Sequence, residues 1–123
     1  MPRNTSHSSD QHEVLVGGLT GQFDGEKLFV RADHISHPNG APPLVNGFRP
    51  DVLAVGEGRR IIGEAETCER LNDGHTWQQL RAFSDATKKP GTELHVAVPQ
   101  RCVCEFRKKA AKSGVEVTQW WRA

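Results

Sequence analysis

The feature that most constrains this chain is a pair of apolar, β-branched runs separated by Gly56-Glu57-Gly58. The first run is Val-Leu-Ala-Val at 52–55, and the second is Arg-Arg-Ile-Ile-Gly-Glu-Ala at 59–65. Two such runs around a short glycine-containing segment predict a tight β-hairpin. Both strands are apolar on both faces, which is typical of strands in the middle of a sheet with helices on either side. The sequence therefore predicts an α/β fold.

Three acidic residues, Asp51, Glu64 and Glu66, lie at one end of this hairpin. If the strands pair symmetrically, Asp51 lies opposite Glu64 with Cβ atoms about 5 Å apart. Glu66 points to the same face as Glu64, because side chains alternate along a strand. Like charges placed directly opposite each other destabilise a sheet, so these acids need a compensating cation. We expect Asp51 and Glu64 to bind Mg²⁺ or Mn²⁺, which carboxylate oxygens hold well.

Length, charge and cysteine content narrow the class of protein. The 123 residues suffice for one domain, and 16 Lys and Arg against 15 Asp and Glu give a net charge of +1. This balance neither favours nor excludes a nucleic-acid partner. The chain has no apolar run of membrane-spanning length and no signal-peptide pattern at its N-terminus, so no membrane partner is expected. The odd set of Cys68, Cys102 and Cys104 indicates neither a disulfide framework nor a zinc knuckle, and predicts a reducing, cytoplasmic setting.

The remaining pattern predicts the other elements of a single domain over 10–123, preceded by a disordered tail at 1–9. A short helix begins with Asp10 as its cap and Glu13 as the second half of a capping box, and Gly17-Gly18 end it. Further strands and helices are expected as follows: strand 27–32, loop 34–46, helix 75–88, strand 93–98, helix 99–113 and strand 115–121. The order α-β-β-β-α-β-α-β predicts a central mixed sheet flanked by helices.

Pro50-Asp51, the following spacer and Glu64-x-Glu66 resemble the motif of the PD-(D/E)xK phosphodiesterase superfamily, which includes restriction endonucleases and Holliday junction resolvases. The element order over about residues 10–121 is similar to the core of that superfamily. The chain also resembles a group of small bacterial proteins that share three motifs, here Gly47–Asp51, Gly63–Thr67 and His75-Thr76 with Gln79. The resemblance implies a restriction-endonuclease-like three-layer fold and a bacterial or phage nuclease.

The chain departs from that superfamily at one position, because Glu66 stands where the motif lysine belongs. Some active restriction enzymes carry Glu there as a base or metal-linked group, and other members have lost catalysis. Lys88 and Lys89 are candidates to replace the missing cation. From the residues alone, Glu66 could equally be an outward-facing acid paired with a nearby arginine, namely Arg49, Arg59 or Arg60.

The resemblance also points to Gln79, which matches a helix glutamine facing the nuclease active site, and to Glu13, at the place of an additional acid on the first helix. From the residues alone, Gln79 could simply be a polar residue on a helix surface, and Glu13 could be a helix-capping residue. Several other polar residues could either have a function or simply be exposed to solvent. They are His34 and His37 as ligands or a base, His75 as a phosphate contact, and the basic run Arg101, Arg107, Lys108, Lys109 and Lys112 as a DNA-backbone contact.

Together these observations predict Mg²⁺-dependent hydrolysis of DNA, with Asp51, Glu64, Glu66 and Gln79 as catalytic residues. So small a chain has no separate recognition module, so it is expected to read DNA structure or to depend on a protein partner. The resemblance to resolvases implies a homodimer. The alternatives are a catalytically inactive nuclease-fold module that binds nucleic acid or a protein, and hydrolysis of an RNA phosphodiester.

Overall fold

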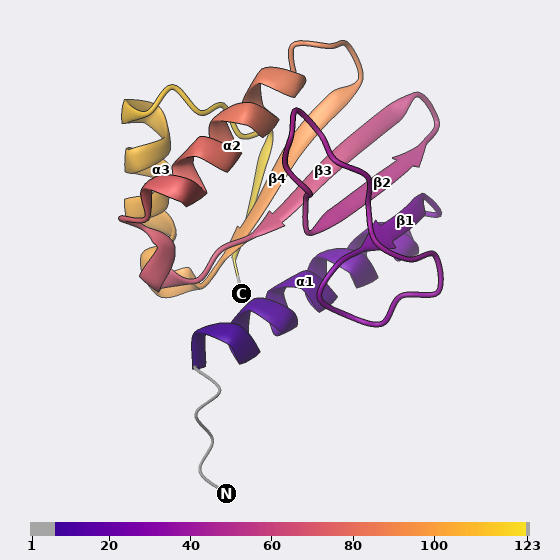
Figure 1. Cartoon of the computed structure of the whole chain (residues 1–123), viewed down its shortest axis with the longest axis horizontal. Coiled ribbons are helices and arrows are strands. Elements are labelled where there is room, and N and C mark those ends of the chain that lie inside the picture. The colour runs from indigo at the N-terminus through magenta and orange to yellow at the C-terminus, as the bar shows by residue number, and fades with distance from the viewer. Residues whose placement is uncertain (1–6, 123) are drawn as a thin grey trace, which may run out of the picture.

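A five-stranded mixed sheet in the order β1-β2-β3-β4-β5 forms the centre of the molecule (Figure 1). The structure is a computed structural model that describes residues 7–122. The strands are β1 (Phe29–Ala32), β2 (Val52–Gly56), β3 (Arg59–Ala65), β4 (Thr92–Val98) and β5 (Gln119–Arg122). β2 runs antiparallel to both β1 and β3, whereas β4 runs parallel to both β3 and β5. The predicted mixed sheet is confirmed.

The predicted hairpin is formed by β2 and β3. Val52 pairs with Gly63 and Gly56 pairs with Arg59, so the turn consists of Glu57 and Gly58. Both turn residues have positive φ values, 54° and 77°, as a two-residue type I′ turn requires. The same register continued by one residue places Asp51 opposite Glu64, as the sequence predicted.

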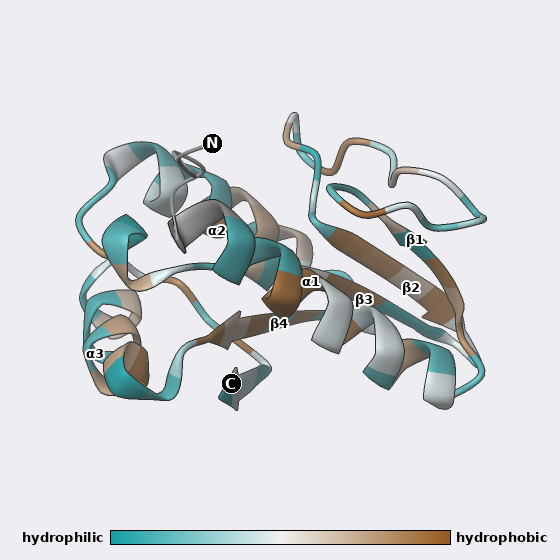
Figure 2. Ribbon diagram, turned by 90° about the horizontal axis from the view of Figure 1, so that it is seen from below, coloured by the Kyte–Doolittle hydropathy of each residue, from teal (hydrophilic) through white to brown (hydrophobic). Residues whose placement is uncertain are grey.

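Helices cover both faces of the sheet, so the fold has three layers. The helices are α1 (His7–Gly25), α2 (Gly74–Ala86) and α3 (Val103–Lys112), with short 3₁₀ turns η1 (Cys68–Arg70) and η2 (Gln100–Cys102). α1 packs on one face of the sheet, and α2 with α3 on the other, each through its own apolar cluster. Figure 2 shows the hydrophobic strands enclosed between these more polar helices.

The first helix is longer than the sequence predicted. It begins at His7, inside the expected tail, while residues 1–6 of that tail lie outside the described residues. It continues through Gly17-Gly18 to Gly25, so Asp10 and Glu13 lie within the helix and do not form a capping box. Leu15, Leu19 and Phe23 recur every four residues and are buried against the sheet. Their burial outweighs the cost of helical glycines, about 1 kcal/mol each.

The second predicted helix is confirmed with small shifts at its ends. Asp73 caps α2 by accepting a hydrogen bond from the backbone N–H of His75 at 3.1 Å. Trp77, Leu80 and Phe83 form the expected apolar stripe and are buried. The cap fixes the start of α2 near the carboxyl end of β3.

Cys68 and Cys102 form a disulfide, with Cα atoms 5.9 Å apart. The interpretation that the odd number of cysteines indicates no disulfide framework is therefore wrong for Cys68 and Cys102. The odd count arises because Cys104 is free and exposed. The bond joins η1, which follows β3, to η2, which follows β4, so it holds together two connections at the carboxyl ends of parallel strands.

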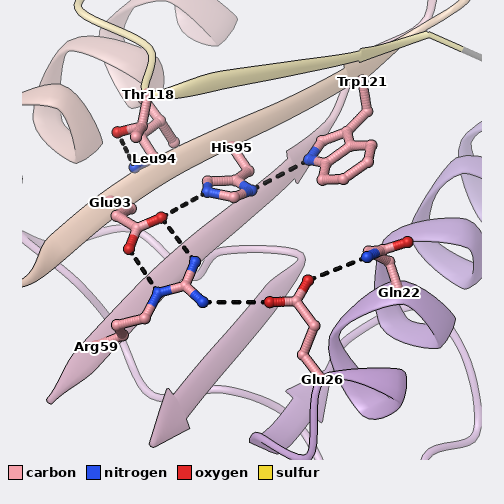
Figure 3. Close-up of polar contacts among 8 residues, drawn as sticks. All are labelled: Gln22, Glu26, Arg59, Glu93, Leu94, His95, Thr118 and Trp121. Carbon is pink, nitrogen blue, oxygen red and sulfur yellow. Dashed lines mark hydrogen bonds and ion pairs between the residues drawn. The ribbon is translucent and has the colours of Figure 1, made fainter. Parts of the chain in front are cut away.

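A cluster of polar side chains joins the C-terminal end of α1 to the sheet near the beginnings of β3 and β4 (Figure 3). The guanidinium of Arg59 donates to both carboxylate oxygens of Glu93, at 2.8 and 3.0 Å, and to Glu26 at 3.2 Å. Glu93 also contacts His95 Nε2 at 2.9 Å, and Trp121 Nε1 donates to His95 Nδ1 at 3.1 Å. Arg59 is thus engaged with other acids, which overturns its suggested pairing with Glu66.

The fold class is therefore α/β, with a five-stranded mixed sheet between helical layers. Within residues 7–122, no helix has both the length and the apolar character needed to span a bilayer.

Candidate functional site

A cavity of about 360 Å³ opens at the end of the hairpin where the three predicted acids lie. Its walls come from the N-terminal half of α1, the loop after β1, the start of β2, the end of β3, and the segment leading into α2. The lining residues are His12, His34, Arg49, Asp51, Glu64, Ala65, Glu66, Thr67, Arg70, His75, Thr76 and Gln79. All four predicted catalytic residues, Asp51, Glu64, Glu66 and Gln79, line this one cavity.

Asp51 and Glu64 hold each other in place through the backbone. The N–H of Asp51 donates to Oε2 of Glu64 at 2.7 Å, and the N–H of Ala65 donates to Oδ2 of Asp51 at 2.9 Å. Both side chains are buried, as is Glu66. Three acids thus lie together out of solvent, as the hairpin register predicted.

Two histidines contact the carboxylate of Asp51. His12 Nε2, from α1, lies 3.1 Å from Oδ2, and His34 Nε2, from the loop after β1, lies 3.2 Å from Oδ1. The two imidazole rings meet edge to face with centroids 4.8 Å apart. Among the described residues, His12, His34 and Asp51 form a group whose possible metal-ligating atoms all lie within 4.8 Å of one another.

The electrostatic environment of Asp51 favours its ionised form. Burial acts to raise the pKa of Asp51, but hydrogen bonds from His12 and His34 outweigh burial, and the N–H of Ala65 adds to them, so the pKa lies below its ordinary value. The hydrogen bond to Asp51 in turn raises the pKa of His34. A carboxylate with two imidazoles against it therefore forms the charged centre of the cavity.

In contrast to Asp51, Glu64 and Glu66 have pKa values above the ordinary value for glutamate. Burial raises the pKa of Glu64 well above its usual value, and the neighbouring charges of Asp51 and Glu66 raise it further. Burial and the charge of Asp51 also raise the pKa of Glu66. The two buried carboxyl groups therefore bind a proton more readily than an exposed glutamate does.

The outer wall of the cavity supplies polar and cationic groups. Arg49 donates to the carbonyl of Pro42, and Arg70 donates to Asp73 at 2.8 Å. Gln79 lies on α2, six residues after the cap Asp73, and also lines the cavity. The charge of Arg70 acts to lower the pKa of Glu66, so Arg70 is a cation that acts on this acid pair. The suggested pairing of Glu66 with Arg49 remains a prediction, although both line the cavity.

Other residues suggested by the sequence lie elsewhere. Lys88 and Lys89 follow the C-terminal end of α2, whereas the cavity lies at its N-terminal end, about 20 Å away for a helix of 13 residues. They therefore cannot replace the motif lysine. Glu13 is exposed on α1 and does not line the cavity, although its charge raises the pKa of His34. His37 lies 3.5 Å from Asp24.

The basic residues of the last helix are exposed and also do not line the cavity. They are Arg101 in η2, and Arg107, Lys108, Lys109 and Lys112 in α3, of which Lys109 is half-buried. Arg101 precedes Cys102, which the disulfide joins to Cys68, two residues after Glu66.

Neither His12 nor Arg70 was predicted as a lining residue, whereas Thr67 and Thr76 lie within the motifs Gly63–Thr67 and His75-Thr76. The error over His12 follows from ending the first helix at Gly17-Gly18. Had the helix been extended, the spacing of His12, Val16, Leu19 and Phe23 would have placed His12 on the buried face.

Comparison of the chain with known protein families, with curated proteins and with solved structures finds no match. The geometry and chemistry of the cavity therefore carry the functional conclusion.

Proposed function

We propose that this protein is a metal-dependent phosphodiesterase that hydrolyses DNA in the cavity at the end of the β2–β3 hairpin. The observation that supports this most is the convergence of buried Asp51, Glu64 and Glu66 in a cavity whose rim carries Arg49 and Arg70. Buried carboxylates can bind a divalent cation and act as a general base, while arginine side chains can bind the phosphate of the substrate. The restriction-endonuclease-like variant of the α/β fold belongs to this same proposal.

Each residue has a role in this proposal. Asp51 would hold a divalent ion, and such an ion would polarise the phosphodiester and neutralise developing charge. Glu66 accepts a proton from the attacking water as the new P–O bond forms and the bond to the leaving oxygen breaks; the leaving oxygen takes a proton from solvent. Glu64 holds the Asp51 backbone N–H in place, as its 2.7 Å hydrogen bond supports. Gln79 orients the water or a phosphate oxygen.

The cationic rim would bind the substrate backbone. Arg70 and Arg49 line the cavity and take the place of the missing motif lysine as sources of positive charge. Arg101 extends this surface along η2, whereas Arg107, Lys108 and Lys112 would reach a longer DNA segment along the exposed face of α3. Because the described chain is one small domain, a junction, flap or end is the favoured substrate, with a second copy or a protein partner for targeting.

A cleavage assay tests this proposal. Labelled linear, flapped and four-way-junction DNA, and RNA of matched sequence, are incubated with the protein and Mg²⁺, Mn²⁺ or Zn²⁺. We expect cleavage of at least one DNA substrate and loss of about a hundredfold or more in rate for Asp51→Asn. The Lys88→Ala variant serves as a control, because Lys88 is exposed and distant from the cavity.

Three results would overturn the proposal. Binding of DNA or of a protein without any cleavage would favour the inactive-module alternative, which the Glu at position 66 makes the main competitor. Cleavage of RNA alone would move the activity to another substrate class. A rate unaffected by Asp51→Asn would show that the cavity is not the active site.

A further inference from the structure

We propose that His12, His34 and Asp51 form a three-ligand site for an imidazole-preferring transition-metal ion, such as Zn²⁺ or Co²⁺, rather than for Mg²⁺. This assignment deepens the proposed function and rests on it for the role of the ion, although binding itself is measured without turnover. It replaces the expected pair of Asp51 and Glu64 with a ligand set drawn from three separate elements: α1, the loop after β1, and the start of β2.

The distances between the donor atoms favour a shared ion. His12 Nε2 and His34 Nε2 lie 3.1 and 3.2 Å from different oxygens of Asp51, and all three ligand atoms lie within 4.8 Å. Two ligands that each lie about 2.1 Å from one ion are about 3 to 4 Å apart. Small side-chain rotations are therefore enough to place all three ligands around one ion.

The types of donor atom select the class of ion. Imidazole nitrogen suits Zn²⁺, Co²⁺, Ni²⁺ and Fe²⁺, while Mg²⁺ prefers an all-oxygen, octahedral set and gives up its waters reluctantly. A site with two imidazoles and one carboxylate thus has the wrong donors for Mg²⁺. Three protein ligands also leave coordination positions open for substrate, as in catalytic rather than structural metal sites.

The surrounding structure holds the three ligands in position. The N–H of Ala65 fixes the Asp51 carboxylate at 2.9 Å. His34 has a φ of 67°, in the left-handed region, and its N–H donates to the carboxylate of Asp33 at 3.0 Å. His12 is carried by α1, whose buried stripe packs against the sheet. Backbone hydrogen bonds and the packing of α1 therefore restrict where these side chains can lie.

Glu64 is already engaged and is a poor ligand in this arrangement. Its Oε2 accepts the Asp51 N–H at 2.7 Å, and its side chain is buried. Withdrawing Glu64 from this hydrogen bond would leave a buried backbone donor without its partner. The histidines, in contrast, have no such backbone bond to lose through Nε2 and are more exposed, at 25% and 49% for their side chains. The histidine-containing set can therefore bind an ion with less rearrangement.

The test is calorimetric titration of the full chain with Zn²⁺ and, separately, with Mg²⁺, in a buffer that does not bind metals. We expect Zn²⁺ to bind at least about a hundredfold more tightly than Mg²⁺. His12→Gln and His34→Gln should each weaken Zn²⁺ binding by at least about tenfold. His37→Gln is the matched control from the same loop, because His37 pairs with Asp24, and it should leave the affinity unchanged. Glu64→Gln should change the affinity by less than about threefold.

A second measurement on the unmodified protein keeps the test valid if a variant fails to fold. Zinc should shift the imidazole NMR resonances of two histidines and leave those of His37 and His75 in place. Equal affinity for Mg²⁺ and Zn²⁺, or a loss of binding in Glu64→Gln but not in the histidine variants, would overturn the assignment. Zinc binding through the histidines without DNA cleavage would support the site while refuting the proposed function.

Discussion

The backbone N–H of Asp51 donates a 2.7 Å hydrogen bond to the side chain of Glu64, thirteen residues later in the chain. Asp51 lies just before β2, where the ladder with β3 ends, so this N–H has a side chain as its acceptor in place of a backbone carbonyl. Glu64 is buried. It therefore has a structural role at the mouth of the hairpin in addition to any chemical role in the cavity.

This relationship predicts different effects for two substitutions of Glu64. Glu64→Ala removes the acceptor and leaves the buried Asp51 N–H unpaired, which should lower the free energy of unfolding by about 1 to 3 kcal/mol. Glu64→Gln keeps a carbonyl oxygen at the same place and removes a buried ionisable group, so its effect should be within about 1 kcal/mol. Urea unfolding monitored by circular dichroism measures both. Equal destabilisation by the two variants would contradict the structural role.

Substitution of Glu66 should lower the cleavage rate without changing the affinity for zinc. If Glu66 is the base, Glu66→Gln lowers the rate of phosphodiester cleavage by about 10² to 10⁴, because the amide cannot accept the proton of the attacking water. Zinc affinity should stay within about threefold, since Glu66 is not in the ligand set. Single-turnover cleavage and calorimetry on the same preparation provide the comparison. A variant that cleaves at the unmodified rate would remove Glu66 from the mechanism.

The sheet was predictable because its strands carry local signals. The turn residues Glu57 and Gly58 and the apolar runs beside them fix both the hairpin and its register. Once that register is known, the proximity of Asp51 and Glu64 follows from strand geometry alone. The helix covering the other face was less predictable, because Gly17-Gly18 resembles a stop signal and only tertiary burial of Leu19 and Phe23 overrides it.

The histidines of the site were harder to predict, for a physical reason. His12 and His34 reach Asp51 from segments 39 and 17 residues away, whose relative placement depends on the packing of α1 and the path of the loop after β1. No local pattern encodes those contacts. The Cys68–Cys102 bond was not predicted for the same reason, because the pairing of cysteines far apart in sequence is set by the fold and not by their count.

The Arg59–Glu93 pair should make stability depend on pH in acid. Hydrogen bonding to Arg59 lowers the pKa of Glu93 to about 2, from 4.5. A lowered folded-state pKa stabilises the protein above pH 4.5, and this contribution is lost as the pH falls towards 2. Because the side chain of Arg59 is 38% exposed, solvent screening should reduce the contribution to about 1 kcal/mol.

Glu93→Gln tests this dependence. The difference in free energy of unfolding between the unmodified protein and the variant should be about 1 kcal/mol at neutral pH and close to zero at about pH 2. Gln keeps only one of the two oxygens that accept from Arg59, so the change of the difference with pH, and not its size at one pH, reports the charge. Urea titrations across this range supply the difference. A gap that stays constant with pH would show that the ionisation of Glu93 is not the source of the stability.

The disulfide should contribute measurably to stability. It closes a loop with a sequence separation of 34, for which the restriction of the unfolded chain amounts to about 3 to 4 kcal/mol. Cys102→Ser should therefore lower the free energy of unfolding by about 3 kcal/mol in oxidising buffer and by much less in reducing buffer. Cys104→Ser, which removes the free, exposed thiol, is the control and should have little effect. Mass spectrometry of proteolytic fragments identifies the bonded pair, and a Cys102–Cys104 or Cys68–Cys104 linkage would contradict the structure.

Gly63 couples the packing of α1 to the geometry of the site. A Cβ atom at Gly63 would lie 3.2 Å from Cβ of Val52 and 3.3 Å from Cε2 of Phe23, closer than ordinary contacts. Gly63→Ala should therefore cost about 1 to 3 kcal/mol of stability and push α1 away from the sheet. Since α1 carries His12, zinc affinity should fall as well. The control is Gly17→Ala, on the same helix with open space around its Cβ, which should stabilise the protein by up to about 1 kcal/mol and leave zinc affinity unchanged. If Gly63→Ala lowered stability but not zinc affinity, the position of α1 would not control the ligand set.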